Sequence, residues 1–448
     1  MNRLTVIVLL LLTLAGCANY GTPKNVAISD SRVADSYSLH DWVLAHNDKE
    51  IRFILTFSGG GTRAAALSYG VLQELRDTTI NFDGRKTRLL DEVDYISSVS
   101  GGSFTSAYYG LYGDGIFENF EEDFLRYDLE KHLLLRALNP LLLFSKKGRT
   151  ESAIKYYQKF LFHDATFADM IHPDRPMIVI NATDLAYGIR FSFIQEYFDL
   201  LCSELSTFPI AEAVAASSAV PVLFDPVVVE NHDTCSGMQL IGKAALLKAG
   251  EYYRGQNLPE LISQLETYGD KDRRKFVHFV DGGITDNLGL RALSDTLAAS
   301  GGVEGALKRS IERGYGLPRH IVVIMVNAAT AFDAEMNLSN KNPRASRVVN
   351  AVTSLQLRRY DDDSILMVKE NLRSMAQLFS TPEQPVKTHF IEVSIQDVDK
   401  PDILEFLNKV PTSFSLSDDQ VDKLIESGRV ILRNNREFKN LVRDLNIQ

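Results

Sequence analysis

Short apolar runs rich in β-forming residues alternate with helix-like stretches from about residue 50 to residue 330, and this alternation most limits what the chain can fold into. The predicted strands are Ile51–Phe57, Val93–Ser98, Met177–Ala182, Arg190–Ile194, Phe276–Val280 and His320–Val326. The predicted helices are Ala64–Leu75, a stretch that follows Gly101-Gly102 and runs to about Tyr112, Ile210–Ser217 and Leu288–Ala299. Alternating strands and helices bury a sheet between helical layers, so the sequence predicts an α/β fold with a largely parallel central sheet.

No linker, repeat or low-complexity tract divides this region, which we take as one domain over residues 37–330. The chain from about residue 380 carries a strand-like run, Phe390–Ile395, and two polar helices. Residues 331–448 are therefore predicted to form a C-terminal extension that packs on the same domain.

The charge balance excludes one class of partner. Lys plus Arg number 48 and Asp plus Glu number 58, which gives a formal net charge of −10. A nucleic-acid-binding protein needs a basic field, so nucleic acid is not an expected partner. The three cysteines are too few for a disulfide scaffold, and neither zinc-ligand spacing nor a calcium loop is present, so no metal or other cofactor is expected.

The N-terminus has the pattern of an export signal. Arg3 precedes the apolar run Leu4–Leu14, which is too short to span a membrane, and small residues follow it. The stretch ending Leu14-Ala15-Gly16-Cys17 resembles the lipobox of bacterial lipoproteins, which implies a signal peptide over residues 1–16 and a diacylglycerol thioether on Cys17. Residues 17–36 would then be a lipidated tether, and Ala18 after the cysteine suggests an outer-membrane destination. The alternative is an ordinary cleaved signal.

Cys202 and Cys235 remain if Cys17 carries lipid. Export implies an oxidising compartment, where two thiols can pair. The sequence leaves open whether they form a disulfide or are two independent buried thiols.

A glycine loop, Gly59-Gly60-Gly61, separates the first predicted strand from the helix after it, and Arg63 follows. Backbone N–H groups in such a loop can hold a phosphate or stabilise an oxyanion, and the helix N-terminus adds positive potential. The spacing also fits a loose dinucleotide fingerprint. That fingerprint needs an acidic residue at the end of a second strand, whereas the chain around Asp83-Gly84 is turn-like.

A second motif, Ser98-Val99-Ser100-Gly101-Gly102, approximates the nucleophile elbow Gly-x-Ser-x-Gly at a strand-to-helix turn. Such an elbow exposes the hydroxyl of a strained serine, here Ser100. The alternative is a serine-rich turn that caps a helix.

A third motif, Asp281-Gly282-Gly283, directly follows the strand Phe276–Val280. A carboxylate at a strand end can approach another loop closely, although Asp281 could also be a simple turn residue. Asp286 is predicted to cap the next helix.

Together the three motifs resemble those of the patatin-like phospholipase family, as do Asn181–Ala186 and the stretch Ala213–Pro221 with Phe224–Pro226. The resemblance covers roughly residues 50–330. It implies a three-layer α/β fold and hydrolysis of acyl esters by a Ser–Asp dyad without histidine.

By that resemblance, Ser100 attacks the acyl carbonyl, Asp281 accepts its proton, and the loop Gly59, Gly60 and Gly61 forms the oxyanion hole. Arg63 either contacts a phosphate headgroup or fixes the loop, and we favour the structural role. A histidine mechanism would need His278, His320 or His389, each of which lies in or beside a predicted strand and is better explained as structure.

Access to lipid is less clearly marked. The apolar stretch Leu133–Phe144 precedes Lys146, Lys147 and Arg149, and such a stretch either dips into an anionic bilayer interface or forms a buried helix broken at Pro140.

The sequence therefore predicts a lipid-anchored serine acyl hydrolase that acts on phospholipid or lysophospholipid. A general carboxylesterase and a catalytically silent lipoprotein that binds lipid or a partner are the alternatives. The headgroup, the acyl position and the oligomeric state stay open.

Overall fold

The computed structural model describes residues 21–28, 36–46, 49–128, 148–221, 223–235, 258–332, 337–343 and 345–446. The predicted lipidation site Cys17, the apolar stretch Leu133–Phe144, Lys146 and Lys147 lie outside these ranges. None of the helices within them is long and apolar enough to cross a membrane.

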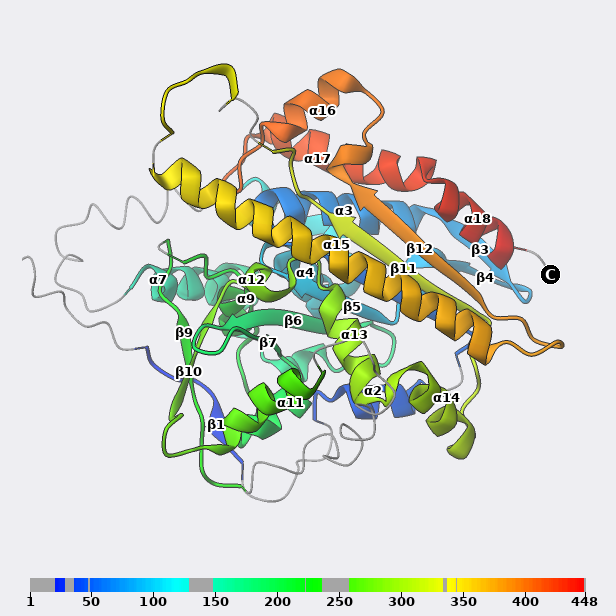
Figure 1. The fold of residues 1–448 in the computed structure, drawn as a ribbon. Helices are drawn as coiled ribbons and strands as arrows, with labels where there is room; N and C mark the ends of the chain where they lie inside the picture. The colour runs from blue at the N-terminus through cyan, green and yellow to red at the C-terminus, as the bar shows by residue number, and fades with distance from the viewer. Residues whose placement is uncertain are drawn as a thin grey trace, which may run out of the picture.

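A large central sheet organises the molecule (Figure 1). Its order is β12-β11-β2-β5-β6-β10-β9, and β7 also pairs with β6. The described strands are β1 (Val26–Ala27), β2 (Ile51–Phe57), β3 (Thr79–Phe82), β4 (Arg85–Arg88), β5 (Tyr95–Val99), β6 (Met177–Asp184), β7 (Ile189–Ser192), β8 (Ser203–Glu204), β9 (Val227–Glu230), β10 (Phe276–Val280), β11 (His320–Asn327) and β12 (Lys387–Ser394).

The sheet is mixed. β12, β11, β2, β5 and β6 run parallel, as the alternation of strands and helices predicts. β7 and β10 pair antiparallel with β6, and β9 pairs antiparallel with β10, which the sequence prediction did not include. The predicted site residue Asp281 therefore follows an antiparallel strand, β10.

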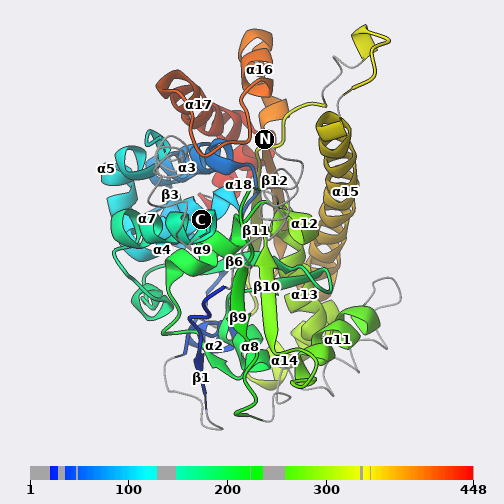
Figure 2. The ribbon, with the colours of Figure 1, turned by 90° about the vertical axis from the view of Figure 1, so that its left-hand side faces the viewer.

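Helices cover both faces of the sheet and complete three layers, which Figure 2 shows nearly edge-on. The described helices are α2 (Leu39–Ala45), α3 (Gly61–Asp77), α4 (Gly101–Tyr112), α5 (Ile116–Phe120), α7 (Arg149–Tyr156), α8 (Gln195–Phe198), α9 (Ile210–Ser217), α11 (Leu258–Glu266), α12 (Gly283–Asp286), α13 (Leu290–Ala299), α14 (Gly302–Glu312), α15 (Ala345–Phe379), α16 (Pro401–Asn408), α17 (Asp418–Asn434) and α18 (Arg436–Leu445).

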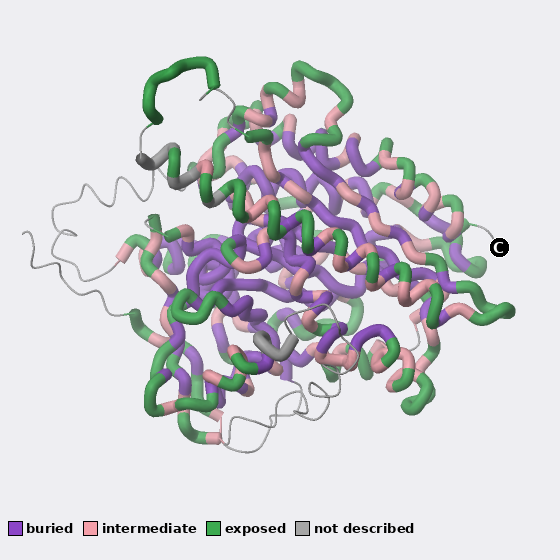
Figure 3. Tube along the Cα trace, in the orientation of Figure 1, coloured by how far each residue is buried: buried purple, intermediate pink, exposed green. Residues whose placement is uncertain are grey.

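Strand β11 shows how the two cores form. Its alternate residues Val322, Ile324 and Val326 join the larger core, which includes buried side chains of α3, α4 and α17. The residues between them, Ile321, Val323 and Met325, join a second core with α13 and α15. The strand is buried on both faces, as expected for a parallel sheet covered by helices, and Figure 3 shows this burial along the sheet.

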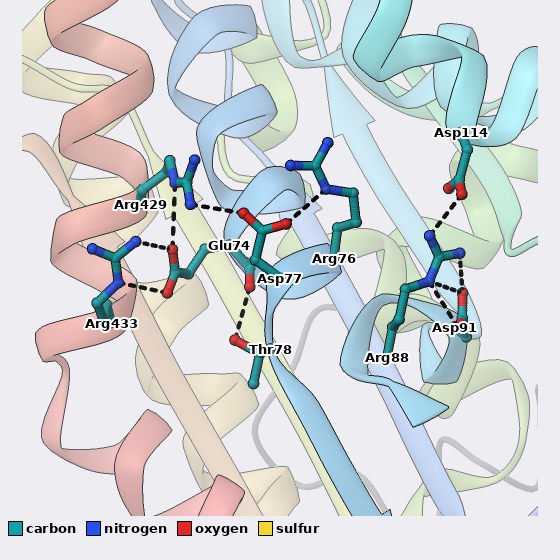
Figure 4. Close-up of polar contacts among 9 residues, drawn as sticks. All are labelled: Glu74, Arg76, Asp77, Thr78, Arg88, Asp91, Asp114, Arg429 and Arg433. Atoms are coloured by element: carbon teal, nitrogen blue, oxygen red, sulfur yellow. Dashed lines mark hydrogen bonds and ion pairs between the residues drawn. The ribbon is translucent and has the colours of Figure 1, made fainter. Parts of the chain in front are cut away.

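The C-terminal residues build part of the main body. β12 extends the sheet as its edge strand, and α17 crosses α3 so closely that a Cβ at Gly70 or Gly428 would overlap the backbone of the other helix. The buried Glu74 of α3 binds Arg429 and Arg433 of α17, with a 2.8 Å contact from Arg433 Nε (Figure 4). Three helices, α16 to α18, stand where the sequence predicts two.

The described part of the N-terminal segment, within the stretch predicted to be a tether, packs against the rest of the protein. Residues Val26–Ala27 pair with β8, and the buried Asn25 side chain bonds to both backbone groups of Glu230. Cys202 and Cys235, whose pairing the sequence left open, form a disulfide with a Cα–Cα distance of 5.5 Å.

Candidate active site

Ser100 occupies a sharp turn between a strand and a helix. β5 ends at Val99 and α4 begins at Gly101, which leaves Ser100 at φ 50°, a left-handed conformation that costs energy for a residue other than glycine. Only 4% of Ser100 is exposed. Ser98, which stands where the elbow motif has glycine, is buried and its hydroxyl accepts a hydrogen bond from Ser106. Serine therefore fits at this position.

The glycine loop lies directly against this turn. A Cβ at Gly101 would overlap the carbonyl of Gly61, and a Cβ at Gly59 would come within 3.4 Å of the Ser100 Cβ. Gly60 and Gly61 have φ values of 141° and 61°, and glycine tolerates both. The predicted loop and the predicted nucleophile are therefore neighbours.

The N–H groups of the loop have different partners. The N–H of Gly59 donates to the carbonyl of Asn287 at 3.0 Å. The N–H groups of Gly60 and Gly61 have no acceptor among the described residues, and they stand at the N-terminus of α3. Unpaired N–H groups at a helix N-terminus can stabilise a developing negative charge.

Asp281 reaches Ser100 from the antiparallel strand β10. Val99 lies opposite Asn181 and Val280 lies opposite Thr183, so the next residue of each strand comes level with the same point on β6. The Ser100 hydroxyl donates to Asp281 Oδ2 at 2.7 Å. The Asp281 carboxylate thus reaches Ser100 although β10 is antiparallel to β6.

The environment of Asp281 suits a base. The residue is 9% exposed, and burial raises the pKa of its carboxyl from 3.8 to about 6, even though hydrogen bonds from Ser100 and the Gly283 N–H oppose the shift. The carboxylate is therefore mostly ionised at neutral pH yet more basic than an ordinary aspartate. This combination allows it to accept a serine proton.

Ser217 supports the nucleophile, and sequence reasoning gave it no role. The Ser100 N–H donates to Ser217 Oγ at 2.8 Å, and that hydroxyl donates onward to the Asn181 carbonyl at 2.6 Å. Both residues lie in the two additional stretches that carry the family resemblance, which was the available signal. Their contacts hold the strained turn in place.

Asn287 and Asp361 form a second support that the sequence did not reveal. Asn287 follows α12, its carbonyl accepts from Gly59, and its Nδ2 donates to Asp361 Oδ2 of α15 at 3.0 Å. Asp361 is buried, and this burial raises the pKa of its carboxyl to about 7. A side chain from the long helix α15 therefore reaches the residue that holds the glycine loop.

Arg63 makes structural contacts. Its Nε donates to the Ala328 carbonyl at 2.9 Å, Nη1 to the Val410 carbonyl at 2.7 Å and Nη2 to Thr412 Oγ1 at 3.0 Å. Burial lowers the pKa of its guanidinium to about 10. These contacts favour the structural interpretation of Arg63 over headgroup binding, and beside them the Thr62 N–H donates to the Ser413 carbonyl at 2.9 Å.

The remaining candidates lie elsewhere. His320 and His389 stack near the first residues of β11 and β12, at the opposite end of these strands from the glycine loop. His278 is exposed on β10 and lines a cavity whose lining includes neither Ser100 nor Asp281. The helix α13 begins at Leu290, two residues later than predicted, so Asp286 is not its N-cap residue. Asp286 Oδ2 nevertheless accepts a hydrogen bond from the Ala292 N–H in the first turn of that helix.

No group of three or more His, Cys, Asp or Glu side chains within the described ranges could hold a metal ion. Asp83-Gly84 forms the turn of the β3–β4 hairpin, with φ values of 49° and 77°. The acidic residue that a dinucleotide site requires at this point is therefore in a hairpin turn.

Comparisons with known proteins identify a family for the chain. A family model described as Patatin-like phospholipase matches residues 55–294. No curated protein sequence matches the chain. Human GIVD cytosolic phospholipase A2 is similar in structure, with a TM-score of 0.41 and 14% identity over 96% of this chain and 68% of that one. The same human protein in complex with methyl gamma-linolenyl fluorophosphonate gives 0.39 and 14% over 91% and 61%. These scores are low, so the family assignment rests on the family model, which spans more than half of the chain.

Proposed function

Since the chain belongs to the patatin-like phospholipase family and is a lipid acyl hydrolase, we propose that it cleaves carboxylic ester bonds of phospholipids or lysophospholipids through Ser100 and Asp281. The observation that carries this proposal is the 2.7 Å hydrogen bond from the hydroxyl of the strained Ser100 to Asp281 Oδ2. A silent binding protein has no need of this arrangement.

The first half of the reaction forms an acyl-enzyme. Asp281 takes the hydroxyl proton as Ser100 Oγ bonds to the carbonyl carbon of the ester. The negative charge that develops on the carbonyl oxygen is held by the N–H groups of Gly60 and Gly61, and one such donor contributes about 3 kcal/mol in related chemistry. The bond to the leaving alcohol then breaks, and Asp281 returns the proton to that oxygen.

The second half releases the fatty acid. Asp281 takes a proton from water as the water oxygen attacks the acyl carbon, and the same N–H groups hold the second oxyanion. The bond to Ser100 breaks, and Ser100 Oγ recovers the proton from Asp281. The raised pKa of Asp281 suits both directions of transfer.

We also propose that Cys17 carries a lipid anchor that holds the enzyme at the outer membrane, facing either the periplasm or the outside. The apolar run and the small residues before Cys17 support this proposal. The Cys202–Cys235 disulfide supports an exported protein as well, because disulfides persist in oxidising compartments.

The test is fatty-acid release from phospholipid vesicles labelled at each acyl position. The Ser100→Ala and Asp281→Asn variants serve as inactive controls. We expect release by the wild type alone, with the labelled position giving the regiochemistry. Incorporation of labelled fatty acid into the wild type but not into Cys17→Ser would establish the anchor separately.

Two results would overturn parts of this proposal, one the substrate class and the other the nucleophile. Hydrolysis of a soluble short-chain ester without release from vesicles or from dispersed lysophospholipid would identify a general carboxylesterase. Retention of activity in Ser100→Ala would show that the nucleophile is another residue.

A further inference from the structure

The segment from Asn337 to Tyr360 has an unusual charge. It contains Lys341, Arg344, Arg347, Arg358 and Arg359 and has no Asp or Glu, in a chain whose net charge is −10. Most of this segment is the N-terminal half of α15. It is a basic stretch on an acidic protein, which favours an anionic partner.

The same half of α15 presents apolar side chains outward. Val348, Val352 and Leu355 are exposed, 52% in the case of Val352, and their spacing puts them on one face of the helix. Arg359 is also exposed and continues this row. In the preceding loop, Leu338 is 85% exposed. Apolar and basic residues therefore share one outward face.

This face lies at the end of the molecule that holds the active site. The Asp361 side chain, on the turn after Leu355, binds Asn287, which in turn holds Gly59. The Ala328 carbonyl, at the start of the loop that leads to α15, accepts from Arg63 beside the glycine loop. Figures 1 and 2 both show the first turns of α15 at the same end of the sheet as α12.

We propose that Val348, Val352, Leu355 and Leu338, together with the exposed Lys341 and Arg359, form a docking face for an anionic phospholipid bilayer. The inference rests on the proposed function and names the surface that brings the site to its substrate. A helix that combines an exposed apolar row with Lys and Arg is suited to lie in the headgroup region of a membrane. Each Lys or Arg near an anionic surface strengthens binding about fivefold.

The second half of α15 marks the boundary of the docking face. From Asp361 onward the helix carries four carboxylates against two cations, Lys369 and Arg373. Asp362, Asp363 and Glu370 are exposed. Leu366 is 65% exposed on the row that contains Val352, yet it lies among these carboxylates. An anionic surface would repel this half, so Leu366 provides a matched control.

Vesicle co-sedimentation tests the docking face. The protein used starts at Ala18, so it contains every described residue and lacks the predicted anchor. It also carries Ser100→Ala, which prevents hydrolysis of the vesicle lipid during the binding measurement. We expect tighter binding to phosphatidylcholine vesicles that contain phosphatidylglycerol than to pure phosphatidylcholine. The Val352→Ser/Leu355→Ser variant should bind about tenfold more weakly or worse. Arg359→Gln should bind about fivefold more weakly, and Leu366→Ser should bind like the parent.

Activity separates this proposal from the proposed function. In the active chain, Val352→Ser/Leu355→Ser should lower fatty-acid release from anionic vesicles and leave hydrolysis of a soluble short-chain ester unchanged. The docking face is wrong if this variant binds vesicles like the parent, if Leu366→Ser loses as much binding, or if the parent ignores anionic lipid. If the wild type hydrolyses no ester at all, the proposed function is rejected, whatever the result of the vesicle-binding experiment.

Discussion

Asp281→Asn should remove activity and yet stabilise the folded protein at neutral pH. Burial raises the pKa of the Asp281 carboxyl from 3.8 to about 6, so the fold holds the ionised carboxylate less well than water does. An asparagine keeps the shape and the contacts, since its Oδ1 can accept from the Gly283 N–H and its Nδ2 can donate to Ser100 Oγ. The variant therefore loses a burial penalty without losing a hydrogen bond.

The size of the effect follows from the pKa. Below pH 3.8 the carboxyl is neutral in both the folded and the unfolded chain and contributes nothing. Between pH 3.8 and about 6 the unfolded chain ionises first, so ionisation favours unfolding increasingly as the pH rises. Above that range the penalty is constant at about 3 kcal/mol. For a chain of this length, that is a difference in Tm of about 3 °C.

Thermal unfolding of the wild type and Asp281→Asn across this pH range is the assay. The Tm advantage of the variant should be near zero at about pH 4 and complete at about pH 8. Asp362→Asn, an exposed change that alters the net charge equally, should show no such growth. A Tm difference independent of pH, or a less stable variant at the higher pH, would refute the reasoning.

Three further outcomes are expected. Hydrolysis of a soluble ester should rise about tenfold from pH 5 to pH 7, because Asp281 must be ionised to accept the proton, and a flat profile would contradict its role as the base. Gly101→Ala should lower kcat by about 100-fold or more, because its Cβ would collide with the Gly61 carbonyl and displace the oxyanion loop; near-normal turnover would exclude this packing. Asp361→Ala should lower kcat about tenfold with KM retained, whereas Asp362→Ala should change neither, and equal effects would deny Asp361 a positioning role.

The sequence predicted the parts of the fold that are formed by strong local patterns. β2, β10 and α9 have the predicted bounds, and β5, β6 and β11 lie within two residues of theirs, because short apolar runs ending at glycine or polar residues mark buried strands. The direction of β10 could not be inferred, since a buried strand reads alike in either direction. The β3–β4 hairpin was missed although Asp83-Gly84 is a recognised turn signal.

The long helix α15 was not predicted for a physical reason. Its inward positions include the polar residues Asp361 and Ser364, while Val352 and Leu366 point outward, so it lacks an ordinary amphipathic pattern.

The residues of the candidate site likewise fall into those that the sequence predicted and those that it did not. Ser100, Asp281 and the three glycines stand in turns with special backbone requirements, which leave a local mark in the sequence. Ser217, Asn287 and Asp361 act through hydrogen bonds to residues 36 to 228 positions away, and no short-range pattern in the sequence records such contacts.

The hydrogen bonds from Arg63 and Thr62 to residues 410–413 have a consequence for when the enzyme becomes active. Ser100, Asp281 and the glycine loop are all translated before residue 290, but Val410, Thr412 and Ser413 supply the acceptors beside that loop. A chain still on the ribosome lacks these partners, so the buried Arg63 guanidinium is left with unmet hydrogen bonds and the loop is not yet secured. The site is thus completed only after residues 410–413 have been made and have packed beside the loop, later than the synthesis of Ser100 and Asp281 themselves.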